Sequence, residues 1–446
     1  MNSRPKRWLG FLVLAAVLFG FGSLILGPSG SKSNRRYVLA DGSVLSLGPV
    51  SFGLNRTLRQ YTVTGWRLRL GQRLPASVST RLGWLPGGSA ITLGGDPAQS
   101  NLLVSTICDF ATNATFLTPR VQIFDQAGNV FDGVEGQGSL GSFGAKRITR
   151  MDVWSLPAFP RREKELGLRI LAESNGVWQA VAEFSFPNPV RGDYPNWRPD
   201  ALSTARNVGD LAIAMVNFSS VPGGREPSKL AYTKMEFEVR EAGVASLGIW
   251  EVAGLELADA TGNHWHPRLF GNNTGEERMK FTPANFMGAL WPGEAAWRIK
   301  AEFSRATNFP PEELVTVAGI PVPESKDVIA LNLTTNIAGG QIKLLFISGA
   351  EQEQPGNLKW SGFHDRVNLS VRTDLPAEPI RRLRMVKITD DGGLAVKDLM
   401  GHGDANGLQA TYGFAPHESA RFLTITFAVP ASRFVEFLAR PDFLKP

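Results

Sequence analysis

The residues best suited to chemistry are His264-Trp265-His266, two histidines separated by one aromatic residue. Residues two apart in a β-strand lie on the same face, so both imidazoles could bind one metal ion. Zinc sites use three or four protein ligands, however, and no third ligand lies nearby in the sequence. We therefore predict no metal and no cofactor, with His264 and His266 as the candidates if a metal does bind.

Other groups of reactive residues fall short of a site. In residues 401–407 (GHGDANG), Asp404 and Asn406 have the spacing of the first ligands of a calcium-binding loop. The bidentate Glu and the later ligands of such a loop are absent. We interpret this stretch as a turn. The signatures of serine hydrolases, zinc proteases, phosphate loops and dinucleotide-binding folds do not occur. These absences favour a protein that is not an enzyme, although a dispersed pair of carboxylates would leave no local signature.

One cysteine and one tryptophan need a separate interpretation. Cys108 is the single cysteine, so the chain forms no internal disulfide, and its apolar surroundings predict a buried structural residue. Most of the 11 Trp residues should lie in cores, because burying such a large ring stabilises a fold. Trp197 lies in a segment rich in turn-forming residues, and it is our candidate for an exposed binding platform.

The elements that would position these residues centre on a turn that occurs three times. Its copies are residues 123–129 (IFDQAGN), 257–263 (LADATGN) and 388–393 (ITDDGG). Their aspartates are 134 and then 131 positions apart. Each copy predicts a strand end, a tight Asp-x-x-Gly turn and a returning strand, because Asp can bond the turn backbone and Gly accepts a positive φ.

The flanks of the turns repeat in the same order. A strand-like run precedes each turn, and a stretch with Pro and Glu leads into another strand after it, at residues 160–170, 292–303 and 416–427. We infer three copies of one β module. In this alignment Trp265 matches Phe131, which predicts a core-facing aromatic with the two histidines outside.

Short strands separated by 47 Gly and 29 Pro residues indicate an all-β fold. We predict three tandem immunoglobulin-like antiparallel β-sandwich modules after one N-terminal transmembrane helix. Near the end of the chain, residues 432–440 have the spacing of a short amphipathic helix. The expected division is a basic segment and anchor at 1-36, module 1 at 37-190, module 2 at 205-325 and module 3 at 326-446.

The N-terminus contains a segment that is long enough to span a bilayer. Trp8 to Gly27 is twenty residues without a charge, and a helix of that length covers roughly 30 Å. A cleaved signal peptide is the alternative, but its apolar region is usually shorter and ends in a clearer cleavage site. We predict a retained single-span signal-anchor that places residues 37–446 outside the cytoplasm, in the periplasm or at the cell surface.

Charge argues against nucleic-acid binding. Lys and Arg total 47 against 41 Asp and Glu, and residues 1–36 hold six of the basic residues and no acidic one. The remainder is therefore neutral and has no basic excess to displace counterions from a phosphate backbone. The basic residues after the apolar segment suit lipid headgroups instead.

These patterns predict a membrane-anchored protein of a cell envelope that acts as a non-enzymatic scaffold or protein-binding arm, with a protein partner. Two alternatives stay open. One is an envelope hydrolase with a dispersed carboxylate pair, and the other is an array of glycan-binding modules that uses Trp197.

Overall fold

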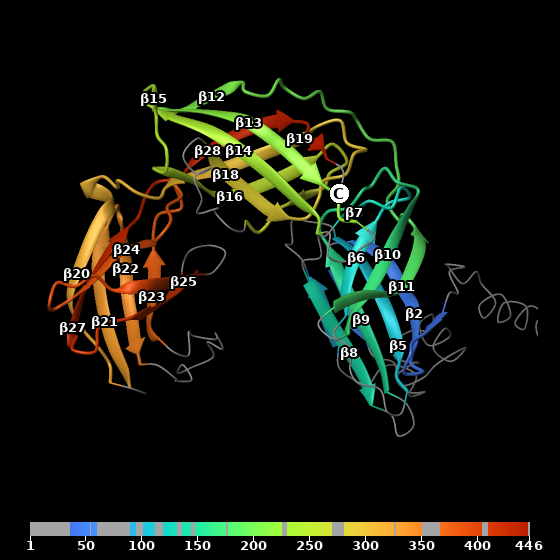
Figure 1. Ribbon diagram of the computed structural model, residues 1–446, viewed down its shortest axis with the longest axis horizontal. Helices are drawn as coiled ribbons and strands as arrows, with labels where there is room; N and C mark the ends of the chain where they lie inside the picture. Colours follow the sequence, from blue (N-terminus) through green and yellow to red (C-terminus); the bar gives the residue numbers. More distant parts are fainter. Residues whose placement is uncertain are drawn as a thin grey trace, which may run out of the picture.

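The computed structural model describes residues 36–53, 55–59, 90–94, 101–111, 119–131, 136–143, 148–174, 177–224, 230–269, 281–324, 327–349, 366–403 and 409–444. This part of the chain is all-β and is built from several antiparallel sheets. Figure 1 shows three lobes arranged as an arch, with the lobe coloured green and yellow at the top.

The expected membrane span, Trp8 to Gly27, lies outside the described residues, as do Asp404 and Asn406. Within the described ranges, no helix has the length and apolar character needed to cross a bilayer.

The first sandwich has two sheets and lies at the right of Figure 1. Its five-stranded sheet has the order β1 (Arg36–Val38), β2 (Val44–Gly53), β5 (Asn101–Asp109), β9 (Ile148–Leu156) and β8 (Gly136–Phe143). Its four-stranded sheet has the order β11 (Val177–Pro187), β10 (Glu165–Ser174), β6 (Arg120–Phe124) and β7 (Val130–Phe131). A separate ribbon joins β3 (Asn55–Arg59) to β4 (Ala90–Gly94).

The middle sandwich also has two sheets. The six-stranded sheet contains β12 (Ala205–Val208), β13 (Leu211–Val221), β14 (Tyr232–Glu241), β15 (Val244–Ala245), β18 (Thr282–Met287) and β29 (Asp442–Phe443). The four-stranded sheet has the order β17 (His264–Trp265), β16 (Trp250–Asp259), β19 (Trp297–Arg305) and β28 (Arg433–Ala439). β29 pairs in parallel with β13, unlike the antiparallel pairs around it.

The third sandwich completes the arch. Its three-stranded sheet has the order β20 (Leu314–Pro321), β27 (Phe422–Ala428) and β24 (Arg384–Asp390). Its five-stranded sheet has the order β21 (Val328–Ile337), β22 (Gly340–Ser348), β23 (Val367–Asp374), β26 (Gln409–Ala415) and β25 (Lys397–Gly403). A one-turn 3-10 helix, η2 (Pro311–Glu313), precedes β20.

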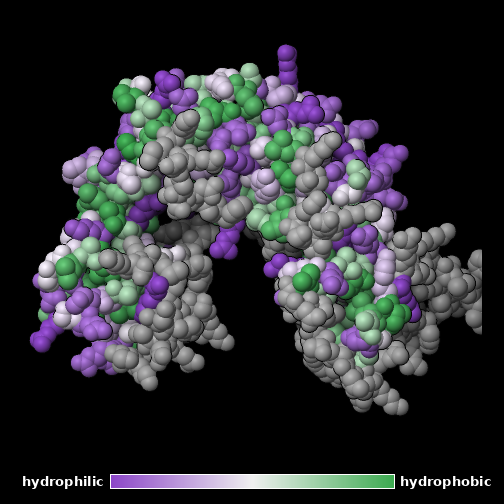
Figure 2. All heavy atoms as spheres, in the orientation of Figure 1, coloured by the Kyte–Doolittle hydropathy of each residue, from purple (hydrophilic) through white to green (hydrophobic). Residues whose placement is uncertain are grey.

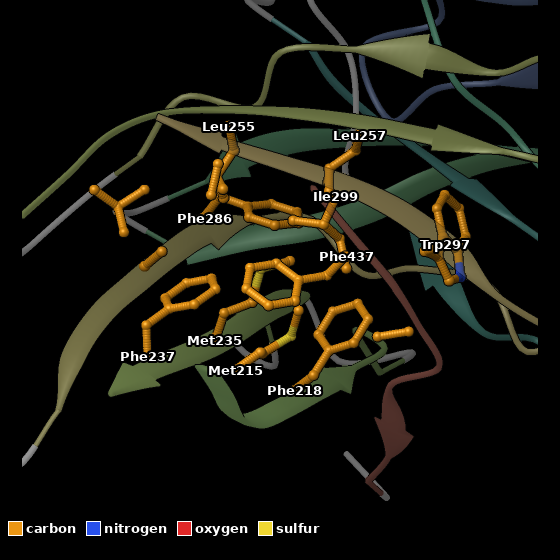
Figure 3. Close-up of a cluster of buried hydrophobic side chains, with 14 of the residues drawn as sticks. Met215, Phe218, Met235, Phe237, Leu255, Leu257, Phe286, Trp297, Ile299 and Phe437 are labelled. Carbon is orange, nitrogen blue, oxygen red and sulfur yellow. The ribbon is translucent and has the colours of Figure 1, made fainter. Parts of the chain in front are cut away.

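Each sandwich has its own cluster of buried hydrophobic side chains. In the middle sandwich, β14 alternates inward residues such as Met235 and Phe237 with outward polar ones. Figure 3 shows these two side chains on one side of the core, with Leu255, Leu257 and Ile299 of the opposite sheet on the other side. The alternation of the sequence therefore decides which face of each strand enters the core, because successive side chains point to opposite sides.

The three predicted turns have the same hydrogen bonds. In each, the Asp N–H donates to the carbonyl four residues later, the Gly N–H donates to the Asp carbonyl, and the residue after Gly donates to the Asp carboxylate. The glycines have φ of 86°, 90° and 80° at Gly128, Gly262 and Gly393. Positive φ costs a glycine nothing, so the prediction of this turn is confirmed at all three places.

The last strands of the middle and third sandwiches are exchanged. In the first sandwich, β10 leads into β11 and pairs with it. The same order would pair β19 with β20 and β27 with β28. Instead, β19 pairs with β28 and β20 pairs with β27. Each of these two sandwiches thus contains a strand that chain order would give to the other.

The two crossing connections lie side by side. Val429 donates its N–H to the carbonyl of Glu313 at 2.9 Å, and Ala431 donates its N–H to the Glu313 carboxylate at 3.1 Å. In Figure 1 the red C-terminal strand consequently lies within the yellow and green lobe. The middle and third sandwiches are therefore joined by two chain segments.

This exchange corrects the sequence-based boundaries. β20 lies in the expected range of module 2 but pairs in the third sandwich, whereas β28 and β29 lie in the range of module 3 but pair in the middle one. The helix expected at residues 432–440 is wrong, because β28 occupies most of it. Val435, Phe437 and Ala439 are buried, at every second position, as expected of a strand. The pairing with β19 selects this two-residue period over the helical spacing.

Candidate functional site

The candidate site lies on the outer face of the sheet β17-β16-β19-β28. Trp265 pairs with Leu257, and both are buried in the core of the middle sandwich. Because strand residues alternate between faces, the neighbours of this pair point outward. The outer face therefore carries His264 and His266 at one edge, and Glu256 on the adjacent strand.

The structure brings the two histidines together with Glu256. The Nε2 atom of His264 lies 2.7 Å from Glu256 Oε1, and the Nε2 atom of His266 lies 3.9 Å from Glu256 Oε2. The two imidazole rings are perpendicular, with centroids 5.3 Å apart. One ligand atom from each of the three residues fits within 4.8 Å of the others. These are the donor types that bind zinc and similar transition metals.

A lysine borders this cluster. Lys300 pairs directly with Glu256 across β16 and β19, and its Nζ lies 3.4 Å from Glu256 Oε2. Burial raises the pKa of Glu256, but the hydrogen bond with His264 and the charge of Lys300 together outweigh it. The pKa of Glu256 therefore lies below its ordinary value, and the carboxylate is ionised at neutral pH.

The expected position of Trp265 is confirmed, but Glu256 was not among the predicted ligands. Glu256 lies eight positions before His264, so the sequence next to the histidines does not reveal it. The missed signal is the turn at residues 259–263. A tight turn fixes the register of its hairpin, and this register sets position 256 diagonally across from His264.

Trp197 lies against the same sheet. The guanidinium carbon of Arg298 on β19 lies 5.6 Å from the Trp197 ring centroid, and the side chain is half-buried. Nearby, Asp200 donates its N–H to the carbonyl of Leu438 on β28 at 2.6 Å. The segment between the first and middle sandwiches thus packs along the middle sheet, and Trp197 is part of that packing.

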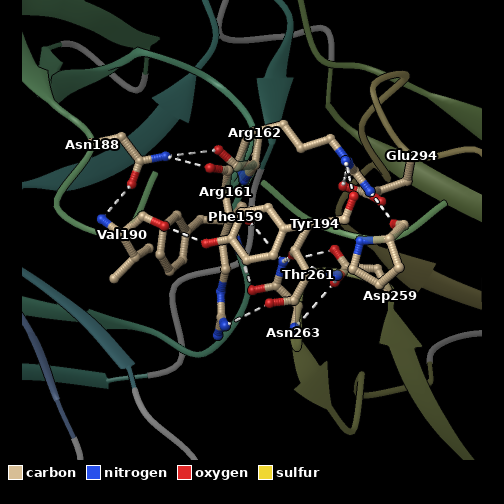
Figure 4. Close-up of polar contacts among 12 residues, drawn as sticks. Phe159, Arg161, Arg162, Asn188, Val190, Tyr194, Asp259, Thr261, Asn263 and Glu294 are labelled. Atoms are coloured by element: carbon tan, nitrogen blue, oxygen red, sulfur yellow. Dashed lines mark hydrogen bonds and ion pairs between the residues drawn. The ribbon is translucent and has the colours of Figure 1, made fainter. Parts of the chain in front are cut away.

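The hairpin that bears the histidines also contacts the first sandwich through its turn. Asn263 donates from Nδ2 to the carbonyl of Phe159 at 2.9 Å and to Asp259 Oδ2 at 2.7 Å. Arg161 donates from Nη1 to the carbonyl of Thr261 at 3.0 Å. Figure 4 shows these contacts between the two lobes. The turn is therefore buried as part of an interface that we call the first junction.

Two further contacts reinforce the first junction. Arg162 forms an ion pair with Glu294 at 2.9 Å, and the Glu294 side chain is 1% exposed. Burial raises the pKa of Glu294 above its ordinary value, although the hydrogen bond from Arg162 opposes this. Phe131, from β7 of the first sandwich, enters the hydrophobic core of the middle one and contacts Trp291, with ring centroids 5.9 Å apart.

A second junction joins the middle and third sandwiches. Glu302 on β19 accepts hydrogen bonds from Arg382 Nε at 2.7 Å, Arg382 Nη2 at 2.5 Å and Ser432 Oγ at 2.6 Å. Arg384 and Glu251 form a further ion pair at 2.6 Å. Burial raises the pKa of Glu302, but these partners lower it more, so the pKa lies below the ordinary value. A buried carboxylate with three donors holds a fixed geometry.

The sheet β17-β16-β19-β28 thus contributes to both junctions, and its outer face carries the cluster of Glu256, His264 and His266, whose side chains are typical metal ligands. Figure 2 shows hydrophilic and hydrophobic residues interspersed over the visible face of the arch. Comparisons with protein-family models and with curated proteins find no family and no relative that match this chain.

Proposed function

We propose that this chain is a non-enzymatic scaffold or protein-binding arm of a cell envelope. The apolar segment from Trp8 to Gly27 anchors it in the membrane, and residues 37–446 lie on the extracytoplasmic side. The three sandwiches are immunoglobulin-like modules that present a protein partner with an extended surface. Membrane, partner and module type all follow from the sequence patterns described above.

The strand exchange between β20 and β28 is the observation that carries this proposal. Two sandwiches joined by one linker rotate freely unless their interface is large. Here two segments cross between the middle and third sandwiches, and each ends in a strand of the other's sheet. Separating them would require breaking strand pairs in both, so the arrangement favours a fixed spacing of surfaces over a movable lid.

The polar clusters at the junctions have structural partners that account for them. Asn263, Glu294 and Glu302 each bond a group from another sandwich or from a crossing segment. An open hollow of about 440 Å³ beside the first junction is lined by five residues, of which Asp193 is the one carboxylate. That hollow, as the described residues form it, lacks the pair of carboxylates that a glycoside hydrolase needs.

Cross-linking in cells, followed by detergent extraction and pull-down of the tagged full-length chain, tests the proposal. The scaffold predicts a stable protein partner whose recovery falls when Arg382→Ala loosens the second junction. Arg206→Ala is the matched control, because it removes only an exposed ion pair between β12 and Asp200, and this variant should keep the partner. Hydrolytic activity lost on one carboxylate substitution, or retention on polysaccharide resin, would contradict the scaffold.

The topology has its own test. A reporter that is active only outside the cytoplasm is fused after Pro446, and a second reporter that is active only in the cytoplasm is fused at the same place. The proposal predicts activity for the first fusion alone. Activity of the cytoplasmic reporter would reverse the assigned orientation.

A further inference from the structure

The outer face of the middle sandwich contains a cluster that the scaffold function does not use. We propose that Glu256, His264 and His266 form a binding site for a divalent transition metal of the zinc type. The proposal stands apart from the scaffold function, since a metal could bind here whether or not the arch holds a partner.

The backbone supplies the first argument, because it fixes all three residues on one face. β16 and β17 are joined by the turn at residues 259–263, and their register pairs Ala258 with His264. Burial of Leu257 and Trp265 on the inner face prevents a one-residue slip, which would turn every side chain over. The three donors therefore meet without any large movement of the backbone.

The distances supply the second argument. A tetrahedral ion with bonds of about 2.1 Å holds its ligand atoms about 3.4 Å apart. The three donor atoms already lie within 4.8 Å of one another. The His266 side chain is 60% exposed, so it can rotate toward the other two without disturbing the core. Three protein ligands leave a further position for water.

The donor set determines which ion is expected. Two imidazoles and one carboxylate suit zinc, nickel and copper, whereas magnesium and calcium prefer oxygen ligands alone. Lys300 opposes any cation, because its Nζ lies 3.4 Å from Glu256 Oε2. This ammonium also lies 5.6 Å from the Phe434 ring, a contact that it can keep when a metal takes the carboxylate.

Isothermal titration of the full-length chain with ZnCl2 tests the site, using a purification tag without histidine. We expect one zinc ion per chain and no heat with MgCl2. His264→Ala and His266→Ala should each weaken zinc binding by at least about tenfold, because losing even an outer contact to a metal ligand typically costs about 10- to 100-fold. His417→Ala is the matched control, because His417 lies in an exposed turn and contacts Ser419. The zinc affinity of this variant should equal that of the parent chain.

Two results would overturn the proposal: no heat with zinc, or the same affinity in both histidine variants as in the parent chain. Unchanged circular dichroism in His266→Ala would show that lost binding does not come from misfolding. The variant Lys300→Gln should change zinc affinity in the opposite direction. Removing this cation should tighten zinc binding roughly three- to tenfold, and weaker binding in this variant would contradict the assigned position of the ion.

Discussion

Asn263 and Phe159 hydrogen-bond each other in both directions across the first junction. Asn263 Nδ2 donates to the Phe159 carbonyl at 2.9 Å, and the Phe159 N–H donates to Asn263 Oδ1 at 3.3 Å. The Asn263 side chain is fully buried. The side-chain amide of Asn263 thus bonds both the N–H and the carbonyl of one residue in the first sandwich. The repeated turn of the middle sandwich therefore forms a contact between the two sandwiches.

Asn263→Ala should destabilise the chain by about 2 kcal/mol, because it leaves the buried N–H and carbonyl of Phe159 without partners. Asn129→Ala is the matched control. Asn129 has the same place in the first turn and donates from Nδ2 to Asp125 at 2.7 Å. Chemical denaturation should show a smaller loss for the control, of about 1 kcal/mol. Equal losses would mean that the contact across the junction contributes nothing.

Glu302→Gln should weaken the second junction by about 3 kcal/mol, since it leaves Arg382 without its buried counter-charge. Glu251→Gln should cost less than about 1 kcal/mol, because that carboxylate is 29% exposed and its ion pair is screened by water. Denaturant midpoints of the two variants provide the measurement. A Glu302→Gln chain as stable as Glu251→Gln would contradict a fixed second junction.

Acid should weaken the second junction, because protonation of Glu302 removes the negative charge that pairs with Arg382. The pKa of Glu302 is lower in the folded chain than its ordinary value of 4.5. Its contribution to stability is therefore fully present above pH 4.5 and is lost as the pH falls through the lower, folded value. Unfolding free energies measured between pH 7 and pH 3 should fall more steeply in the parent chain than in Glu302→Gln. Parallel curves would show that this carboxylate does not carry the effect.

Cys108 should react with thiol reagents only after unfolding. Burial raises the pKa of its thiol to about 11, against the opposing charge of Arg150. The thiolate is the reactive form, so it is scarce at pH 8 in the folded chain. Absorbance with a chromogenic disulfide should reveal no free thiol in buffer and one thiol per chain in denaturant. Rapid reaction in buffer would place Cys108 outside the core.

Local patterns in the sequence predicted local structure well. The three Asp-x-x-Gly turns and the inward position of Trp265 are confirmed, because both follow from hydrogen bonds and face alternation within one hairpin. The pairing of β19 with β28 joins residues that are 130 to 142 positions apart. The local sequence of β28 does not specify that partner, since residues 432–440 have the spacing of a short helix until the pairing with β19 is known.

The candidate site was predictable only in part, because the sequence pattern reports faces within one strand but not contacts between strands. Spacing alone put His264 and His266 on one face, whereas adding Glu256 required the register of the hairpin. Trp197 was the candidate for an exposed binding platform, and in the fold it is half-buried with Arg298 against its ring. Each omission concerns a contact between strands or segments, which depends on tertiary pairing that the periodicity of one segment does not report.

The strand exchange can be tested directly by cross-linking two introduced cysteines. Lys300 and Glu436 lie opposite each other on β19 and β28. In a Cys108→Ser background, Lys300→Cys with Glu436→Cys should give an intrachain cross-link with a short bifunctional thiol reagent. Lys300→Cys with Thr316→Cys, which probes β20 against β19, should give none. A cross-link in the second pair, or dimers only in the first, would contradict strand exchange within one chain.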